Sequence, residues 1–193
     1  MIKDIVLVSS NTHKISEYQH KLLPMKCIPY ESLIGHIDIE EVGETFQENA
    51  YLKASMVHQL TKLPCIADDS GLLVESLPNQ LGVYSRRFSI EMSDESNNRL
   101  LLSKLKGIKD RNAKFVTVIC YIDESSKPHY FQGELHGSIV EVARGHHGFG
   151  YDSVFEIEGT NLTLAELTLE EKNRYSHRAK AIEALKKELI VCI

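Results

Sequence analysis

The sequence predicts an α/β fold built on a mixed β-sheet, and two kinds of pattern support this prediction. Runs of consecutive apolar residues, such as Ile5 to Val8 and Phe115 to Cys120, are typical of buried strands. Between them lie segments with apolar residues at helical spacing and capping residues at their starts. Because the two kinds of segment alternate along 193 residues, we expect one α/β domain spanning residues 1–193.

The first half of the chain is expected to begin with a strand, a turn and a helix. A buried strand over 4–10 leads into a helix over 11–22, which Asn11 or Thr12 can cap. Thr45 and Glu48 have the spacing of a capping box, so a second helix is expected over 45–60. The other elements expected here are an extended piece over 24–29, an acidic loop over 37–44, and strands over 65–69 and 72–76 that flank an acidic turn.

The second half is expected to hold further strands between two capped helices. Ser93 can cap a helix that ends near Gly107, and Thr168 with Glu171 forms another capping box. Ser176 offers a further start for the last amphipathic helix, which runs through Leu189. The remaining elements are a loop over 77–89, a strand over 115–123, one or two strands over 128–143, a glycine-rich loop over 144–152, and a short strand over 153–157.

Charge and composition limit the classes of partner. The net charge is −5, from 22 basic and 27 acidic residues, which argues against nucleic acid or an anionic membrane as the main partner. No apolar run reaches the length of a membrane span or of a signal peptide core. The cysteines are widely spaced and form no CxxC pair, so we expect reduced thiols and a cytoplasmic protein; they are Cys27, Cys65, Cys120 and Cys192.

The stretch LPCIADDSGLLVES places two adjacent carboxylates at the end of an apolar run. Adjacent residues of a strand point to opposite faces, so Asp68 and Asp69 are not expected to face each other. A carboxylate at a strand end is a natural ligand for Mg²⁺, and Gly71 lets the chain turn or lets a ligand come close. A plain turn between two strands also fits these residues, because Asp, Ser and Gly all favour turns.

Two other stretches suggest an anion or metal site. The turn SSNTHK lies between a strand and a helix, where backbone N–H groups and the helix dipole favour an anion, and Lys14 adds a charge. An ordinary helix cap with a surface lysine explains the same residues. Glu40 and Glu41, in IDIEEVGE, are candidates for a second metal ligand, although a solvated acidic loop is the simpler interpretation.

The last two stretches suggest recognition of a base. In GHHGFGYD the glycines let backbone amides approach a ligand, and Phe149 or Tyr151 can stack on a base. The segment EEKNRYSHRAK gathers Lys172, His177 and Arg178 near a helix start, where cations are not favoured by the helix dipole. That placement indicates a nearby anion or carbonyl group, while a solvated helix face remains an alternative.

Taken together and in order, these stretches resemble the inosine triphosphate pyrophosphatase family over about residues 5–185. The matching blocks are SSNTHKISE, EVGETFQENAYLKA, IADDSGLLVESL, GVYSRRFS, GHHGFGYDSVF and AELTLEEKNRYSHRAKA. The resemblance implies an elongated mixed sheet flanked by helices, with two lobes, a central cleft and a homodimer. It also implies Mg²⁺-dependent cleavage of ITP, dITP or XTP to a nucleoside monophosphate and pyrophosphate.

The resemblance also implies roles for particular residues. Asp69 corresponds to the central carboxylate, which binds metal and accepts a proton from water, with Glu40 as the preferred second ligand and Glu41 as the less favoured one. Ser70 and Lys53 correspond to substrate contacts. The phosphate turn is Ser9, Ser10, Asn11, Thr12, His13 and Lys14; the wall around base and ribose is Phe149, Gly150, Tyr151 and Asp152; the base-recognition set is Lys172, His177 and Arg178.

The sequence departs from the family pattern at four positions. Ser10 replaces a usual glycine, Leu81 and Ser153 replace prolines, and Arg86 replaces a small residue. These changes affect loop geometry and substrate range more than the reaction. Two alternatives stay open: a pyrophosphatase for other modified nucleotides, and a nucleotide sensor without turnover.

Overall fold

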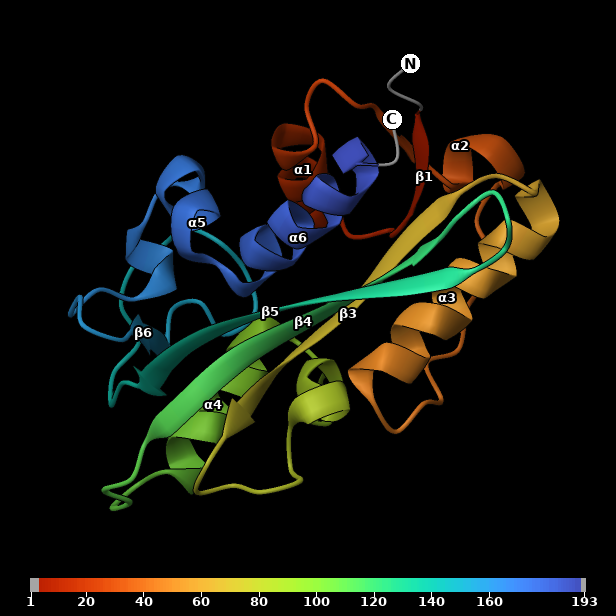
Figure 1. The fold of residues 1–193 in the computed structure, drawn as a ribbon. Coiled ribbons are helices and arrows are strands. Elements are labelled where there is room, and N and C mark those ends of the chain that lie inside the picture. Colours follow the sequence, from red (N-terminus) through yellow and green to blue (C-terminus); the bar gives the residue numbers. More distant parts are fainter. Residues whose placement is uncertain (1–3, 192–193) are drawn as a thin grey trace. The chain divides into compact units, whose positions relative to one another are not determined.

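The computed structural model describes residues 4–191, which form a six-stranded mixed sheet and flanking helices (Figure 1). The strand order is β2-β1-β3-β4-β5-β6. β1 pairs in parallel with β2 and with β3, whereas β5 pairs with β6 in antiparallel fashion, so the predicted mixed sheet is confirmed. The strands are β1 (Ile5–Val8), β2 (Cys27–Pro29), β3 (Cys65–Val74), β4 (Asn112–Ile122), β5 (Pro128–Ile139) and β6 (Phe155–Ile157).

The helices start where the capping residues predict. Asn11 caps the first helix, and the capping boxes that begin at Thr45 and Thr168 are both present. Ser93 forms a similar box with Ser96. The helices are α1 (Thr12–Lys21), α2 (Glu31–Ile34), α3 (Phe46–Thr61), α4 (Asp94–Lys104), α5 (Leu169–Tyr175) and α6 (His177–Val191), with 3-10 helices η1 (Gly82–Arg87) and η2 (Leu164–Glu166). No helix among the described residues is long and apolar enough to cross a bilayer.

The predicted turn at the two aspartates is wrong, because β3 runs without a break through the segment ADDSG. Gly71 permits this by bringing the strand against η1: a Cβ at Gly71 would lie 2.2 Å from the carbonyl oxygen of Gly82. The Ser85 hydroxyl accepts a hydrogen bond from the N–H of Leu72 at 2.9 Å. The turn-forming residues are therefore held in an extended strand by their neighbours, and the glycine serves chain packing.

Contacts divide the chain into two compact units, which we describe separately. The first unit comprises Met1–Asp69, Thr117–Gly133 and Arg178–Ile193, and the second comprises Ser70–Val116 and Glu134–His177. The two units correspond to the predicted pair of lobes, while the central cleft stays a prediction.

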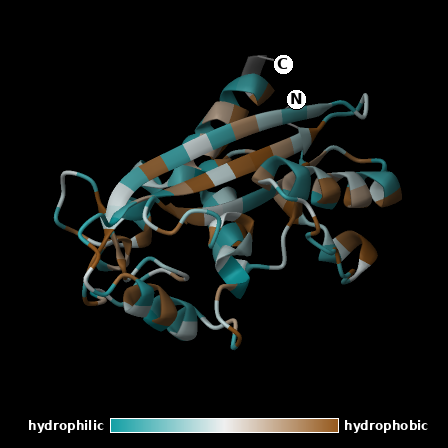
Figure 2. Cartoon of the chain, turned by 90° about the horizontal axis from the view of Figure 1, so that it is seen from below, coloured by the Kyte–Doolittle hydropathy of each residue, from teal (hydrophilic) through white to brown (hydrophobic). Residues whose placement is uncertain are grey.

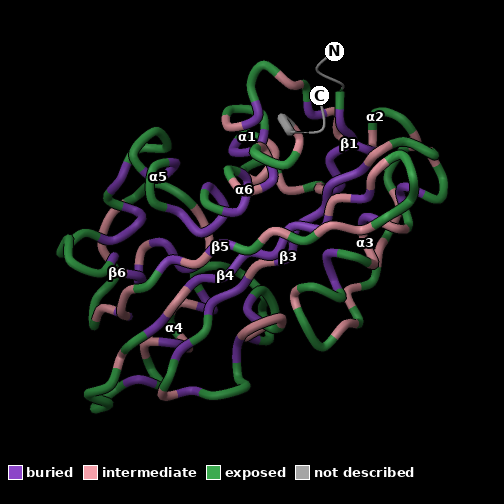
Figure 3. Tube along the Cα trace, viewed as in Figure 1, coloured by how far each residue is buried: buried purple, intermediate pink, exposed green. Residues whose placement is uncertain are grey.

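The first unit has an apolar cluster on each face of its strands. Residues of β1 alternate between the clusters: Ile5 and Leu7 belong to the cluster with α1 and α6, and Val6 and Val8 to the cluster with α3. Buried residues follow β1 and β3 almost continuously, while buried and exposed residues alternate along the helices (Figure 3). Hydropathy alternates along the helices in the same way (Figure 2). Both faces of these strands are covered, which explains their nearly unbroken apolar sequences.

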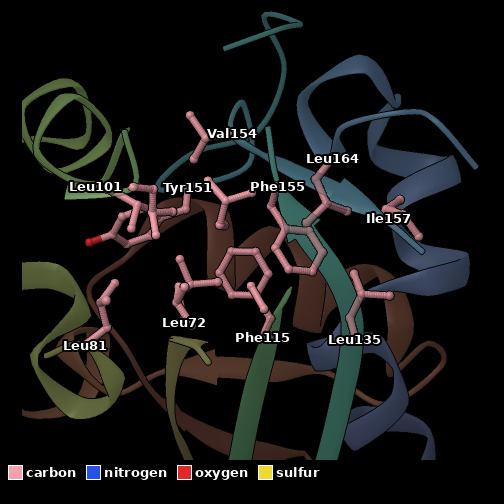
Figure 4. Close-up of a cluster of buried hydrophobic side chains, with 14 of the residues drawn as sticks. Leu72, Leu81, Leu101, Phe115, Leu135, Tyr151, Val154, Phe155, Ile157 and Leu164 are labelled. Atoms are coloured by element: carbon pink, nitrogen blue, oxygen red, sulfur yellow. The ribbon is translucent and has the colours of Figure 1, made fainter. Parts of the chain in front are cut away.

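The second unit has one apolar cluster, in which aromatic residues from β4 and β6 meet leucines from several elements (Figure 4). Phe115 and Phe155 lie with their ring centroids 4.7 Å apart. Tyr151 joins this cluster, and its hydroxyl donates a hydrogen bond to the carbonyl oxygen of Ser85 at 2.6 Å. The glycine-rich loop that precedes β6 is therefore tied to the core of this unit.

Candidate active site

Asp68 and Asp69 lie side by side on β3, but their side chains point to opposite faces of the strand. Asp68 forms ion pairs with Lys14 of α1 and Arg178 of α6. Asp69 accepts a hydrogen bond from the amide of Asn49 on α3. The prediction that the two carboxylates face away from each other is confirmed, and it follows from the two-residue period of a strand.

Asp68 is the centre of a largely buried network of two acids and two bases, in which Lys14 is partly exposed. Its Oδ2 atom lies 2.9 Å from Nζ of Lys14 and 3.3 Å from Nε of Arg178. Arg178 Nη1 lies 2.6 Å from Oε2 of Glu17, and the side chains of Glu17, Asp68 and Arg178 are each at most 3% exposed. Burial alone would raise the pKa of Asp68, but Lys14 and Arg178 outweigh it and hold that pKa well below its ordinary value. This network therefore keeps Asp68 ionised.

Glu17 was not predicted as a site residue, although its spacing from Lys14 places it near the site. Glu17 lies three positions after Lys14 on α1, so the two side chains project from the same face of the helix. Its partner Arg178 is 161 positions away, however, and local spacing does not reveal that pairing. The sequence assigned Arg178 to base recognition; the structure places its guanidinium against Glu17 and Asp68.

Asp69 lies in a different environment, made by α3 and the loop before it. Its Oδ2 atom accepts a hydrogen bond from Asn49 Nδ2 at 3.0 Å, and its Oδ1 atom lies 3.9 Å from Nζ of Lys53. Lys53 is also paired with the carboxylate of Glu41 and donates to the backbone carbonyl of Asp68 at 2.7 Å. Asn49, four positions before Lys53, was not predicted from the sequence. The two carboxylates of Glu41 and Asp69 thus converge on one ammonium group.

The electrostatic balance at Asp69 is the reverse of that at Asp68. Burial raises the pKa of Asp69, the negative charge of Glu41 raises it further, and Lys53 only partly opposes the increase. The net effect lifts the pKa of Asp69 above its ordinary value. A carboxylate in this state gains stability from an added cation and is a stronger base than a free aspartate.

The chemistry of this group fits a hard divalent cation. Carboxylate oxygens are the ligands that Mg²⁺ prefers, and the cation usually keeps several waters alongside one or two protein carboxylates. Glu41 shares Lys53 with Asp69, whereas Glu40 is exposed. Within residues 4–189, no three His, Cys, Asp or Glu side chains are grouped as a ready metal cluster. The Glu41 and Asp69 pair is therefore suited to a hydrated ion that also binds a ligand.

The predicted phosphate turn has part of its backbone already engaged. Asn11 Oδ1 accepts hydrogen bonds from the N–H groups of His13 and Lys14, at 3.0 and 3.1 Å. Ser9 Oγ accepts from the N–H of Asn11 at 3.2 Å. Ser10 and Thr12 are exposed. The side chains of this turn and the charge of Lys14, rather than the amides that Asn11 caps, are what it offers to an anion.

In the second unit, Lys172, Asp152 and Phe149 form a compact group. Lys172 Nζ lies 2.7 Å from Asp152 Oδ2 and 4.5 Å from the centre of the Phe149 ring. Asp152 Oδ2 also accepts a hydrogen bond from the backbone N–H of Phe149 at 2.9 Å. The side chains of Lys172 and Asp152 are at most 5% exposed. Lys172, which the sequence assigned to base recognition, thus meets Phe149 and Asp152, which it assigned to the wall around base and ribose.

His177 and Ser70 complete the predicted residues of this unit. The His177 ring stacks on Phe115, with centroids 4.7 Å apart and an angle of 10° between the planes. Phe115 was predicted only as a strand residue; nothing in its local sequence indicates that it supports a histidine. Ser70 is partly exposed and directly follows Asp69 on β3.

The mixed sheet, its strand order and its flanking helices define an α/β protein of the kind that the sequence resemblance implies. The chain belongs to the Ham1 family, whose model matches residues 5–188. It is similar to the dITP/XTP pyrophosphatases of Geobacter sulfurreducens, at 43% identity over 96% of each chain, and of Deinococcus radiodurans, at 42% identity over 95% of this chain and 92% of that one.

Solved structures show the same likeness. The Staphylococcus aureus Ham1 protein is 37% identical, with a TM-score of 0.90 over 98% of this chain and 100% of that one. A HAM1 protein from Coxiella burnetii is 38% identical, with a TM-score of 0.89 over 98% of this chain and 99% of that one. The family predicted from the sequence motifs is thereby confirmed.

Proposed function

We propose that this chain is a Mg²⁺-dependent pyrophosphatase that hydrolyses ITP, dITP and XTP to the nucleoside monophosphate and pyrophosphate. Relatives named dITP/XTP pyrophosphatase that match at 42–43% identity support this substrate class. The observation that carries the proposal is that Glu41 and Asp69 both lie near Lys53; in the proposal these three residues act as base, metal ligands and phosphate contact. Such an enzyme would remove deaminated purines from the nucleotide pool.

In this proposal Asp69 acts as the proton acceptor. Its carboxylate orients a water molecule and takes a proton from it as the water oxygen attacks the α-phosphorus. The bond between that phosphorus and the bridging oxygen breaks, and pyrophosphate leaves with the electron pair. Asn49 holds one oxygen of Asp69 at 3.0 Å, which fixes the carboxylate for this task.

Asp69 and Glu41 are the proposed ligands of Mg²⁺. The sequence favoured Glu40 over Glu41, but the exposed position of Glu40 and the pairing of Glu41 with Lys53 support Glu41. When bound, the ion supplies positive charge that offsets the charge developing on the phosphate oxygens.

Lys14 and Lys53 are the proposed phosphate contacts. The protein has a net charge of −5, so a polyanionic substrate needs local positive charge. Both lysines are already held by carboxylates, Lys14 by Asp68 and Lys53 by Glu41. This arrangement fixes the lysines before the substrate binds and lowers the entropy cost of binding. The side chains of Ser9 to Thr12 and Ser70 are further proposed contacts.

Base recognition is assigned to the second unit, with Phe149 to Asp152, Lys172 and His177 as its residues. Hypoxanthine and xanthine carry a 6-oxo acceptor where adenine carries an amino donor. A site that presents donors to this position leaves adenine with an unpaired polar group, and such a site rejects the wrong base by up to about 10⁴-fold. Arg178 is proposed to contribute mainly by holding Asp68 and Glu17.

The direct test is pyrophosphate release, with and without Mg²⁺, from ITP, dITP, XTP, GTP, ATP, a modified pyrimidine nucleotide and a methylated nucleotide. We expect rapid release from the first three with Mg²⁺ only. Binding of ITP without any release would favour a nucleotide sensor, and faster release from modified pyrimidine or methylated nucleotides would favour a related pyrophosphatase. Equal rates on ATP and ITP would contradict the base recognition but not the hydrolysis. The homodimer and the cytoplasmic location remain predictions.

A further inference from the structure

We propose that α4 is a positioning element for the recognition loop, which we define as residues 148–153. Asp94 and Asn98 of α4 hold the backbone of this loop at Gly150. The inference rests on the proposed function, because that function gives the loop its role against the base. Neither Asp94 nor Asn98 is expected to touch the substrate.

The two backbone polar groups of Gly150 both bond to α4. Its N–H donates to Oδ2 of Asp94 at 2.6 Å, and its carbonyl oxygen accepts from Nδ2 of Asn98 at 3.0 Å. Asp94 and Asn98 are four positions apart, so they project from the same face of the helix. Gly150 has a φ of +63°, a conformation that favours glycine. The helix therefore forms hydrogen bonds with both backbone polar groups of one loop residue, Gly150.

Two residues close to Gly150 in the loop, Phe149 and Asp152, contact Lys172. Phe149 lies under the Lys172 ammonium, and Asp152 is paired with it at 2.7 Å. The loop thus presents Gly150 to α4 and Phe149 with Asp152 to Lys172. Because these residues are joined through a few rotatable bonds, release of Gly150 frees the Phe149 ring and the Asp152 carboxylate to shift.

The helix is itself firmly attached to the segment that precedes it. Asn97 Oδ1 accepts from the N–H of Ser89 at 2.8 Å, and Asn97 Nδ2 donates to the carbonyl oxygen of Arg86 at 3.0 Å. Tyr151 reaches the same segment through its hydrogen bond to Ser85. The loop is therefore held by a fixed frame made of η1 and the first turns of α4.

Ser153 shows how this chain adapts at a position where the family resemblance expects proline. Its hydroxyl oxygen accepts a hydrogen bond from Nδ2 of Asn98 at 3.3 Å. A proline would restrict the backbone of the loop covalently, whereas a serine does not. The Asn98 contact supplies part of that restriction through a side chain instead.

The test compares Asp94→Ala and Asn98→Ala with two controls on the same helix, Glu95→Ala and Arg99→Ala. Glu95 shares the first turn and its favourable dipole interaction, and both control residues are exposed. For Asp94→Ala we expect the KM for ITP to rise on the order of tenfold, with kcat within about threefold of the original, because one charge-assisted hydrogen bond is lost. The preference for ITP over ATP should fall in parallel. A smaller rise is expected for Asn98→Ala.

A second readout does not depend on activity. Amide hydrogen exchange, resolved by NMR, should be at least about tenfold faster at Gly150 in Asp94→Ala, and unchanged in Glu95→Ala. An unchanged exchange rate at Gly150 in Asp94→Ala would contradict the proposal that α4 holds the loop backbone at this residue. Faster exchange with unaltered KM and base preference would overturn the link to recognition. If the original enzyme releases no pyrophosphate from ITP, the proposed function fails, whereas the exchange experiment still decides whether α4 holds the loop.

Discussion

The two faces of β3 place adjacent aspartates in opposite electrostatic environments. On the face of α1 and α6, Asp68 meets two cations, and its pKa lies well below the ordinary value despite burial. On the face of α3, burial and the nearby Glu41 outweigh the effect of Lys53, and the pKa of Asp69 lies above the ordinary value of an aspartate. The difference supports the proposal that one strand carries a structural carboxylate and a reactive carboxylate in consecutive positions.

This comparison predicts that substitutions at the two positions fail in different ways. An isosteric amide at 69 removes the proposed base and metal ligand from a site where the fold disfavours the charged carboxylate. The same change at 68 removes the partner of two cations, the partly buried Lys14 and the buried Arg178. The variant at 69 should therefore lose activity without losing stability, whereas the variant at 68 should lose stability.

The largest effect is expected for Asp69→Asn. With Mg²⁺ saturating, kcat for ITP should fall on the order of 10³-fold, because the proton acceptor and one metal ligand are lost together. The free energy of unfolding should not fall, since the charged form of Asp69 is disfavoured in the folded protein. Steady-state kinetics and urea denaturation measure the two quantities. Near-normal turnover would show that Asp69 is not the central carboxylate.

The next effect concerns Asp68→Asn, which should cost about 3–5 kcal/mol of unfolding free energy, since it leaves Lys14 and Arg178 near one another without their shared anion. Urea denaturation followed by circular dichroism gives this value. Asp69→Asn serves as the matched control. Equal unfolding midpoints for the two variants would contradict the distinction between the faces.

The dependence of activity on Mg²⁺ tests which glutamate acts with Asp69 on the α3 face. Glu41→Gln should raise the Mg²⁺ concentration for half-maximal activity by about tenfold, because it removes the charge of a proposed ligand. Glu40→Gln is the matched control, as it makes the same change at the neighbouring exposed position. EDTA should abolish turnover, and added Mg²⁺ should restore it. A larger effect from Glu40→Gln than from Glu41→Gln would reverse the assignment of the second ligand.

The prediction that bears least on activity concerns the buried thiols, which lie in the clusters on both faces of the strands of the first unit. Cys27 lies in the cluster with α1 and α6, while Cys65 and Cys120 lie in the cluster with α3. Burial raises the pKa of Cys27 and Cys120 to about 12 and that of Cys65 to about 11. The fold therefore keeps all three thiols protonated where the unfolded chain, with thiol pKa values of about 8.5, has begun to ionise them.

Stability from this source is complete below about pH 8.5 and is lost as the pH rises toward the folded values. The midpoint of urea unfolding should therefore decrease between pH 8 and pH 10. In a Cys192→Ser background, which removes the cysteine outside the described residues, native protein should react slowly with iodoacetamide at pH 8.5 and unfolded protein rapidly. Rapid alkylation of the native protein would contradict the burial of these thiols.

Local sequence patterns predicted the secondary structure and the family well. Asn11, Thr45, Ser93 and Thr168 marked helix starts because a cap depends on residues within one turn. The opposite orientation of the two aspartates followed from strand geometry alone. The turn predicted at this point was wrong, because the residues that keep β3 extended there belong to η1, over ten positions further along.

What the sequence determined by itself is therefore set by short-range physics: which residues cap helices, which runs form strands, and which motifs identify the Ham1 family. Only the tertiary structure decided that Arg178 pairs with Glu17, that Asn49 holds Asp69, and that Glu41 rather than Glu40 shares a lysine with it. The Arg178 pairing joins residues 161 positions apart. Such contacts depend on how helices pack on the sheet, and many arrangements share the same local pattern, so the charge environment of each aspartate cannot be read from its neighbours in the chain.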